Sequence, residues 1–180
     1  MAMTPRLRTL ALTVHVTSSV GWLGAIIAFL ALAIVGWSSQ DAQTARAVYL
    51  AAEPLTWFVI VPLAFASLLT GLVSSLGTAW GLFRHYWVLF KLLINILATG
   101  ILLMYTQTVS YFAGVAAESG ADIGELRSPT FVLHAALALL VLLVATVLAV
   151  YKPRGMTRYG QRKQHELRHK QHEQPTALVP

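Results

Sequence analysis

The run TLALTVHVTSSVGWLGAIIAFLALAIVGWSSQ occupies residues 9–40, a stretch of 32 residues without Asp, Glu, Lys or Arg. A helix rises 1.5 Å per residue and needs about 20 apolar residues to cross a hydrocarbon core about 30 Å thick. Three more charge-free windows follow, at residues 54–83, 92–117 and 128–151, and each is at least 24 residues long. The chain therefore predicts four membrane spans.

The composition agrees with lipid as the main solvent. Of 180 residues, 57% are hydrophobic and 11% are charged, whereas about a quarter of the residues of a soluble domain carry charge. Lipid cannot pair backbone polar groups, so only helices and closed barrels span a membrane, and the alternating segments of a barrel are absent. We predict an all-α fold, a membrane-embedded four-helix bundle with helices near residues 10–37, 55–77, 87–113 and 130–151. The second span is expected to follow a short helical segment that ends before Pro54.

Lys and Arg divide the loops into two sets. Eleven of the 13 fall in one set, namely Arg6, Arg8, Arg84, Lys91, Lys152, Arg154, Arg158, Arg162, Lys163, Arg168 and Lys170. Because short cytoplasmic loops retain positive residues, this set predicts that the N- and C-termini are cytoplasmic. The first apolar run is too long for a signal peptide, so we expect it to stay as a helix. Residues 1–151 would form the transmembrane domain, and residues 152–180 a basic cytoplasmic tail.

The basic tail and the absence of cysteine limit the functions that the chain can have. Seven basic residues beside a membrane would attract anionic lipid, at about 1 kcal/mol each, and we expect no nucleic-acid partner. His165, His169 and His172 share one helical face, but the surrounding Lys and Arg oppose metal capture, so no metal site is expected. The chain has no cysteine, which excludes disulfides, iron–sulfur clusters and covalent haem attachment within it.

Polar residues inside the spans are the best functional candidates, because lipid rejects them. His15 and Trp22 lie on one stripe of the first span, and Lys91 and Asn95 on one face of the third. Both ionisable groups fall about 6 to 10 Å inside the cytoplasmic boundary, so they are level with each other. Two plainer interpretations stay open: Lys91 extends its ammonium to the membrane surface, or His15 is a neutral imidazole bonded to a hydroxyl or a carbonyl.

Other polar positions in the spans are expected to have different roles. A stripe of small residues on the second span predicts close helix packing: Ser67, Thr70, Gly71, Ser74 and Thr78. His134 enters from the opposite membrane surface, about 15 Å from His15 in depth. These two histidines cannot therefore ligate one haem together.

The motif H-x6-W, from His15 to Trp22, and the segment GLFRHYWVLFKLLINIL at residues 81–97 resemble a known group of proteins. This is an uncharacterised four-span bacterial membrane family, distantly similar to the copper-resistance D domain and to the haem-containing membrane protoporphyrinogen oxidase. The resemblance implies haem b as cofactor, with His15, Trp22 and Lys91 at its site, to which we add Asn95. It also implies the bacterial cytoplasmic membrane as the location.

Three functions are compatible with the sequence. The first is a haem b redox protein that acts on a quinone or a porphyrinogen. The second is a non-enzymatic accessory or assembly subunit whose tail binds lipid or another membrane protein. The third is a metal transporter, which is disfavoured because no Asp or Glu lies within a span. A second copy of the chain also remains a candidate partner.

Overall fold

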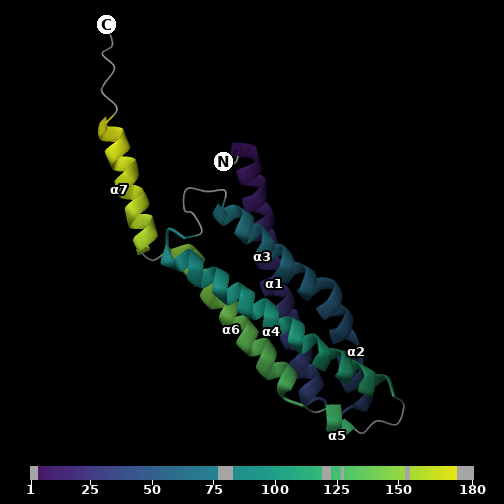
Figure 1. Cartoon of the computed structure of the whole chain (residues 1–180). Coiled ribbons are helices and arrows are strands. Elements are labelled where there is room, and N and C mark those ends of the chain that lie inside the picture. The colour runs from purple at the N-terminus through teal and green to yellow at the C-terminus, as the bar shows by residue number, and fades with distance from the viewer. Residues whose placement is uncertain (1–3, 77–82, 119–122, 127, 153–154, 174–180) are drawn as a thin grey trace.

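The computed structural model of the chain describes residues 4–76, 83–118, 123–126, 128–152 and 155–173 (Figure 1). Four helices in it are long and apolar enough to cross a membrane: Pro5–Ser38, Ala42–Leu76, Tyr86–Ala117 and Thr130–Tyr151. The described residues form no named strand. The prediction of an all-α, membrane-embedded four-helix bundle is confirmed.

The first helix, α1 (Pro5–Ser38), begins five residues before the predicted residue 10. The Thr4 side chain accepts a hydrogen bond from the Leu7 N–H, and Pro5 occupies the first turn, where its missing N–H costs nothing. The prediction placed the start after Arg8 because it followed the apolar run. Arginine is a good helix former with a long side chain, so α1 continues through Arg6 and Arg8.

The second helix is longer than predicted and passes through Pro54. It consists of α2 (Ala42–Leu55), the π-helical turn η1 (Thr56–Ile60) and α3 (Val61–Leu76), which follow one another without a break. The prediction that the outer helical segment ends before Pro54 is wrong. Proline removes one helical hydrogen bond, but the backbone after it stays paired: the Thr56 N–H donates to the Ala52 carbonyl, and the Val61 N–H donates to the Thr56 carbonyl across the wider π turn. The predicted last residue of this span, 77, lies outside the described residues.

The third and fourth spans are α4 (Tyr86–Ala117) and α6 (Thr130–Tyr151), with the short helix α5 (Ile123–Leu126) between them. α4 continues one turn beyond the predicted residue 113 because Ala116 is buried there. α5 was not predicted, since its sequence is polar. Its Leu126 is completely buried, and its carbonyl accepts a hydrogen bond from the Tyr49 hydroxyl.

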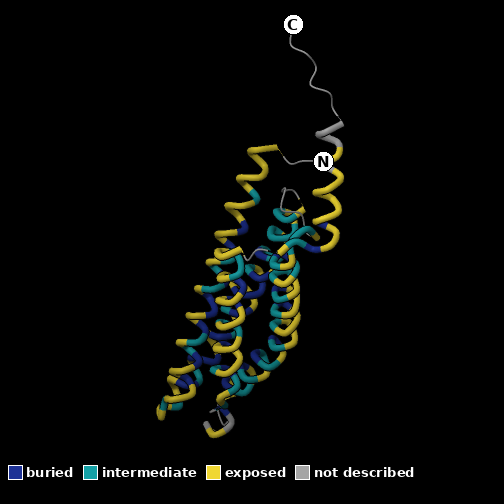
Figure 2. The backbone as a smooth tube through the Cα atoms, turned by 90° about the vertical axis from the view of Figure 1, so that its left-hand side faces the viewer, coloured by how far each residue is buried: buried dark blue, intermediate teal, exposed yellow. Residues whose placement is uncertain are grey.

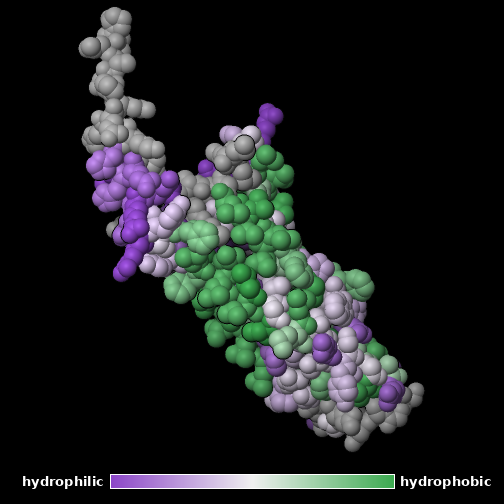
Figure 3. Space-filling view, viewed as in Figure 1, coloured by the Kyte–Doolittle hydropathy of each residue, from purple (hydrophilic) through white to green (hydrophobic). Residues whose placement is uncertain are grey.

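The bundle packs through α1 and α4, each of which contacts α2, α3 and α6. Buried residues lie between the helices and exposed ones on the outside (Figure 2). A cluster of aromatic rings fills the core near α2 and includes Phe29, Tyr49, Tyr105, Phe112 and Phe131. The outer faces of η1, α3, α4 and α6 carry large apolar side chains (Figure 3), such as Phe58 on η1 and Met104 on α4, which are 79% and 78% exposed. A surface of this kind suits acyl chains.

The start of α1 and the end of α6 lie at the same end of the bundle, which we call the basic end (Figure 1). The last helix, α7 (Arg158–Glu173), extends away from it. The Thr157 N–H donates to the Arg84 carbonyl at 3.0 Å, and His85 forms a β-bridge with Met156. A Cβ at Gly160 would lie 2.5 Å from the Arg84 carbonyl oxygen, so only glycine fits this contact. The base of α7 is therefore held against the turn before α4.

The start of α2 gives a pH-dependent contribution to stability. The Asp41 side chain accepts bonds from the Thr44 hydroxyl at 2.6 Å, the Thr44 N–H at 2.9 Å and the Gln43 N–H at 3.3 Å. These hydrogen bonds stabilise the charged carboxylate and so lower the pKa of Asp41, and the bond from the Thr44 hydroxyl has the largest effect. The stabilisation is thus present above the unfolded-state pKa of about 4 and is lost as the pH falls through the lower folded-state value.

We expect Asp41→Asn, which can still cap the helix but has no charge, to remove this pH dependence. At neutral pH the melting temperature of the variant should be lower by at most a few degrees, and the difference should shrink toward about pH 3. Thermal unfolding followed by circular dichroism across this range measures it. A constant difference at all pH values would contradict the assignment.

Candidate functional site

His15 is buried on the face of α1 that packs against α3. Its Nδ1 lies 3.1 Å from the carbonyl oxygen of Ser67 and 3.2 Å from Oγ1 of Thr70. A carbonyl oxygen can only accept, so Nδ1 carries the ring proton and donates it. The imidazole therefore keeps a lone pair on Nε2.

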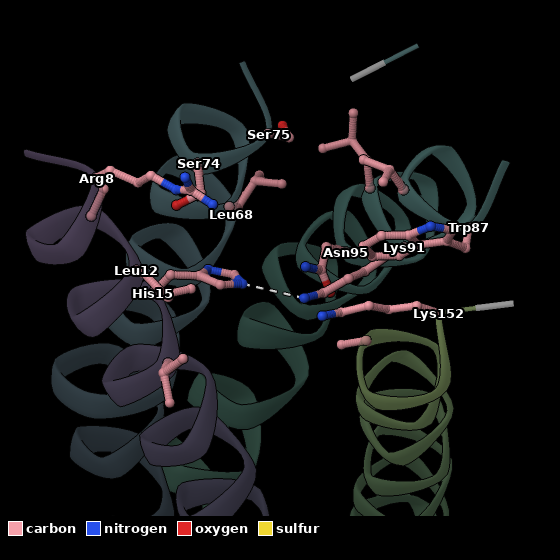
Figure 4. A pocket seen from close by; sticks show the side chains of 16 residues that line it. Arg8, Leu12, His15, Leu68, Ser74, Ser75, Trp87, Lys91, Asn95 and Lys152 are labelled. Carbon is pink, nitrogen blue, oxygen red and sulfur yellow. Dashed lines mark hydrogen bonds between the residues drawn. The ribbon is translucent and has the colours of Figure 1, made fainter. Parts of the chain in front are cut away.

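Lys91 reaches the same ring from α4. Its Nζ lies 3.2 Å from Nε2 of His15. An ammonium has three donors and no acceptor, so Lys91 donates to Nε2, which agrees with the proton position that the Ser67 carbonyl requires. The dashed line in Figure 4 marks this contact, and the ammonium points into the bundle.

Small residues of α3 allow His15 to sit this close. A Cβ at Gly71 would lie 2.9 Å from Cε1 of His15, so the imidazole packs directly on the glycine. The Ser67 hydroxyl is also bonded to the Ser19 hydroxyl at 2.8 Å. The small-residue stripe of the second span thus positions the histidine as well as packing the helices. Its predicted last member, Thr78, lies outside the described residues.

A cavity of about 420 Å³ opens beside the His15–Lys91 pair at the basic end. Its cationic lining comes from three elements: Arg8 on α1, Lys91 on α4 and Lys152 after α6. In Figure 4 these side chains and His15 converge on the same space. None of the described residues that line the cavity is Asp or Glu, and much of the remaining wall is apolar, as at Leu12, Leu68 and Leu92.

This combination of charge and apolar wall indicates the chemistry of a ligand. Three cationic side chains around one cavity repel each other, and at Lys91, which is partly buried, the loss of water adds to the cost of the charge. A negatively charged group in the cavity would offset both terms. The apolar wall would at the same time accept a hydrophobic body. The cavity therefore suits an amphiphilic anion.

The structure brings three of the four predicted cofactor residues together. His15, Lys91 and Asn95 all line the cavity. Trp22 does not: it lines a second cavity of about 410 Å³, and its buried Nε1 has no hydrogen-bond partner among the described residues. The H-x6-W stripe thus contributes to two cavities, because seven helical residues rise about 10 Å.

Arg8, Gly71 and Lys152 belong to the site but were not predicted as site residues. Arg8 lies seven residues before His15, a spacing that places both on one helical face, and this signal was present in the sequence. Lys152 adopts a left-handed backbone at φ 44°, which brings it over the cavity from the end of α6. No local pattern in the sequence indicates that conformation, which lysine rarely adopts.

His134 lies in the second cavity, apart from His15, on the first turns of α6. Its ring stacks on Tyr105 with the centroids 4.0 Å apart. Among the described residues, no three His, Asp or Glu side chains form a cluster that could hold a metal ion.

No protein-family model, curated protein or solved structure matches the chain.

Proposed function

We propose that this integral membrane protein binds haem b in the cavity at the basic end and acts as a redox protein. The observation that supports the proposal most strongly is the orientation of His15. Its Nδ1–H is held by the Ser67 carbonyl, and its Nε2 lone pair is directed at the cavity side, where Lys91 contacts it. Metal-ligating histidines are commonly oriented by such a bond from the other ring nitrogen.

The set of donors fits a haem better than a free metal ion. A structural metal ion needs about four protein ligands, and the described residues offer no such cluster. An iron that is already held by a porphyrin needs as few as one histidine. His15 would supply this ligand through Nε2, and Lys91 would then release its bond to the ring.

The cations of the cavity fit the anionic edge of the same group. Haem b carries two carboxylates on an otherwise apolar ring, which is the amphiphilic anion that the lining suits. Arg8, Lys91 and Lys152 would pair with the carboxylates, and the Asn95 amide could donate a further hydrogen bond. Leu12 and Leu68 would contact the apolar ring.

When bound, haem would supply one-electron transfer at a potential that the ligand and the surrounding charges set. The residues of the chain would hold it, neutralise its carboxylates and exclude water from it. We propose a quinone or a porphyrinogen as the electron partner, because both can reach the protein through the membrane. The basic end would face the cytoplasm of a bacterium, where the anionic leaflet also attracts α7.

Replacing Lys152 separates its charge from its structural position. Lys152→Gly removes the ammonium and relieves the left-handed backbone, so the variant should be more stable by about 1 kcal/mol. Its affinity for haem should nevertheless fall about tenfold, as expected for a lost charge-assisted bond. Haem titration and thermal unfolding in nanodiscs measure both quantities.

Lys152→Asn is the matched control, since asparagine tolerates the left-handed conformation but carries no charge. It should lose the same affinity as the glycine variant. Unchanged haem affinity in both variants would contradict the proposed role of the cations. If both variants keep their affinity for haem but bind anionic lipid more weakly, the cavity would be assigned to a lipid headgroup instead.

The alternative is a non-enzymatic accessory subunit, which one observation favours. α7 extends from the bundle with an exposed, hydrophilic surface (Figure 3). Its base is fixed to the turn before α4 by the bond from the Thr157 N–H to the Arg84 carbonyl. A helix held in this way could dock on another membrane protein. In that case a stoichiometric partner should co-purify with the full chain from native extracts. Deleting residues 158–180 should abolish this co-purification but leave haem binding unchanged.

A further inference from the structure

The second cavity lies between α1, η1, α4 and α6 and opens toward lipid. Several lining residues on α4 and α6 are more than half exposed, namely Leu97, Ile101 and Leu137 at 55%, 58% and 60%. These helices form the apolar face seen in Figure 3. A ligand could therefore enter sideways from the bilayer, without passing through water.

The polar side chains of this cavity lie toward the end of the bundle opposite the basic end. His134 is exposed on the first turns of α6, and its ring stacks on Tyr105 at an interplanar angle of 15°. Nδ1 of His134 lies 2.9 Å from the Thr130 carbonyl, so this nitrogen carries the proton and donates it. Nε2 is left as an acceptor, and no described residue donates to it.

Nε2 of His134 is an exposed acceptor at the edge of an apolar cavity, where a bound ligand can donate a hydrogen bond to it. The deeper wall consists almost entirely of aliphatic and aromatic side chains, such as Ile26, Phe29 and Leu142. A ligand that fits would present a hydroxyl to His134, a flat ring to Tyr105 and Phe29, and an apolar tail to the opening between α4 and α6. An aliphatic alcohol would satisfy the first of these but would stack poorly on the rings.

We propose that this cavity binds a lipid-soluble molecule with a hydroxyl on an aromatic ring, the chemistry of a quinol, and that His134 Nε2 accepts its hydrogen bond. The site is separate from the His15 cavity and would bind whether or not haem is present. The polar end of this second cavity lies in the other half of the bilayer from the His15 cavity. His134 is near the start of α6 and His15 is near the start of α1, and these two helices begin at opposite ends of the bundle. The proposal concerns binding and assigns no electron transfer.

Three probes test the chemistry without the complication of oxidation: decylphenol, decylanisole, whose hydroxyl is blocked, and decylcyclohexanol, whose ring is not flat. A ligand that binds only the folded protein raises the melting temperature. In nanodiscs of the wild-type protein, decylphenol should raise it and bind about tenfold more tightly than decylanisole. Equal stabilisation by these two would overturn the role of the hydroxyl. If decylcyclohexanol binds more tightly than decylphenol, the proposed requirement for an aromatic ring is wrong.

Two pairs of variants test the location. Ala138→Phe places a ring in the cavity, whereas Ala136→Phe places one on the exposed face of α6 and serves as its control. Only the first should abolish the effect of decylphenol. His134→Phe keeps the stack on Tyr105 but removes the acceptor, so it should bind decylphenol and decylanisole alike. His15→Ala should not alter decylphenol binding. If Ala138→Phe responds like Ala136→Phe, or His134→Phe still prefers decylphenol, the location is wrong.

Discussion

Replacing His15 by alanine should abolish haem binding while the bundle stays folded. Among the described residues that line the cavity, His15 is the only histidine, so its imidazole would be the iron ligand. The variant also leaves the Ser67 carbonyl and Lys91 without this partner, so a moderate loss of stability is expected as well. We expect at least a tenfold smaller Soret absorbance per protein after expression with excess haem.

His134→Ala is the matched control, because it removes the other histidine of the described membrane spans. Its haem content should equal that of the wild type. Free imidazole should restore part of the Soret band in His15→Ala by entering the space that the side chain left. Full haem content in His15→Ala, with a folded spectrum in the far ultraviolet, would rule out His15 as the ligand.

Replacing Gly71 by alanine should have nearly the same effect on haem binding, although glycine has no side chain that could bind a ligand. The new Cβ would lie 2.9 Å from Cε1 of His15, closer than atoms pack, so the ring must move. The Ser67 carbonyl holds the imidazole through Nδ1, so a ring displaced by the new Cβ would lose this bond and, with it, the orientation of Nε2. We expect a loss of affinity of tenfold or more.

Gly100→Ala provides the comparison, because nothing lies within 4 Å of a Cβ at that position of α4. Alanine is the better helix former by about 1 kcal/mol in a helix interior, so this variant should be slightly more stable and bind haem normally. Haem titration and thermal unfolding of both variants give the answer. If Gly71→Ala gains stability as Gly100→Ala does, and keeps its affinity, the packing of His15 on Gly71 has no part in binding.

The four membrane spans could be predicted from the sequence because the charge-free windows reflect the cost of placing a charge in lipid. The prediction of a helix end before Pro54 was wrong because a rule for helices in water was applied to a membrane helix. In a membrane a proline is tolerated when the rest of the backbone around it stays hydrogen-bonded, as it does here through the N–H groups of Thr56 and Val61. Depth along the helix also placed His15 and Lys91 at one level, and the structure puts them in contact.

The rest of the site depends on features that sequence patterns do not encode. Arg8 and Lys152 served in the sequence only as indicators of membrane orientation, and their convergence follows from the packing of α1 beside α3 and α6 and from the left-handed backbone after α6. Trp22 shares a stripe with His15, but the stripe passes from one cavity to the other. The docking of α7 needs contacts between residues about 70 positions apart, such as Arg84 and Thr157.

The absorption spectrum of the purified wild-type protein, expressed with excess haem and kept in nanodiscs, is the most direct test of the central claim. We predict a Soret band with about one haem per chain, together with bands that change on reduction by dithionite. A folded, monodisperse protein that shows no Soret band, even after haem is added back, would contradict the assignment of the cavity at the basic end to haem.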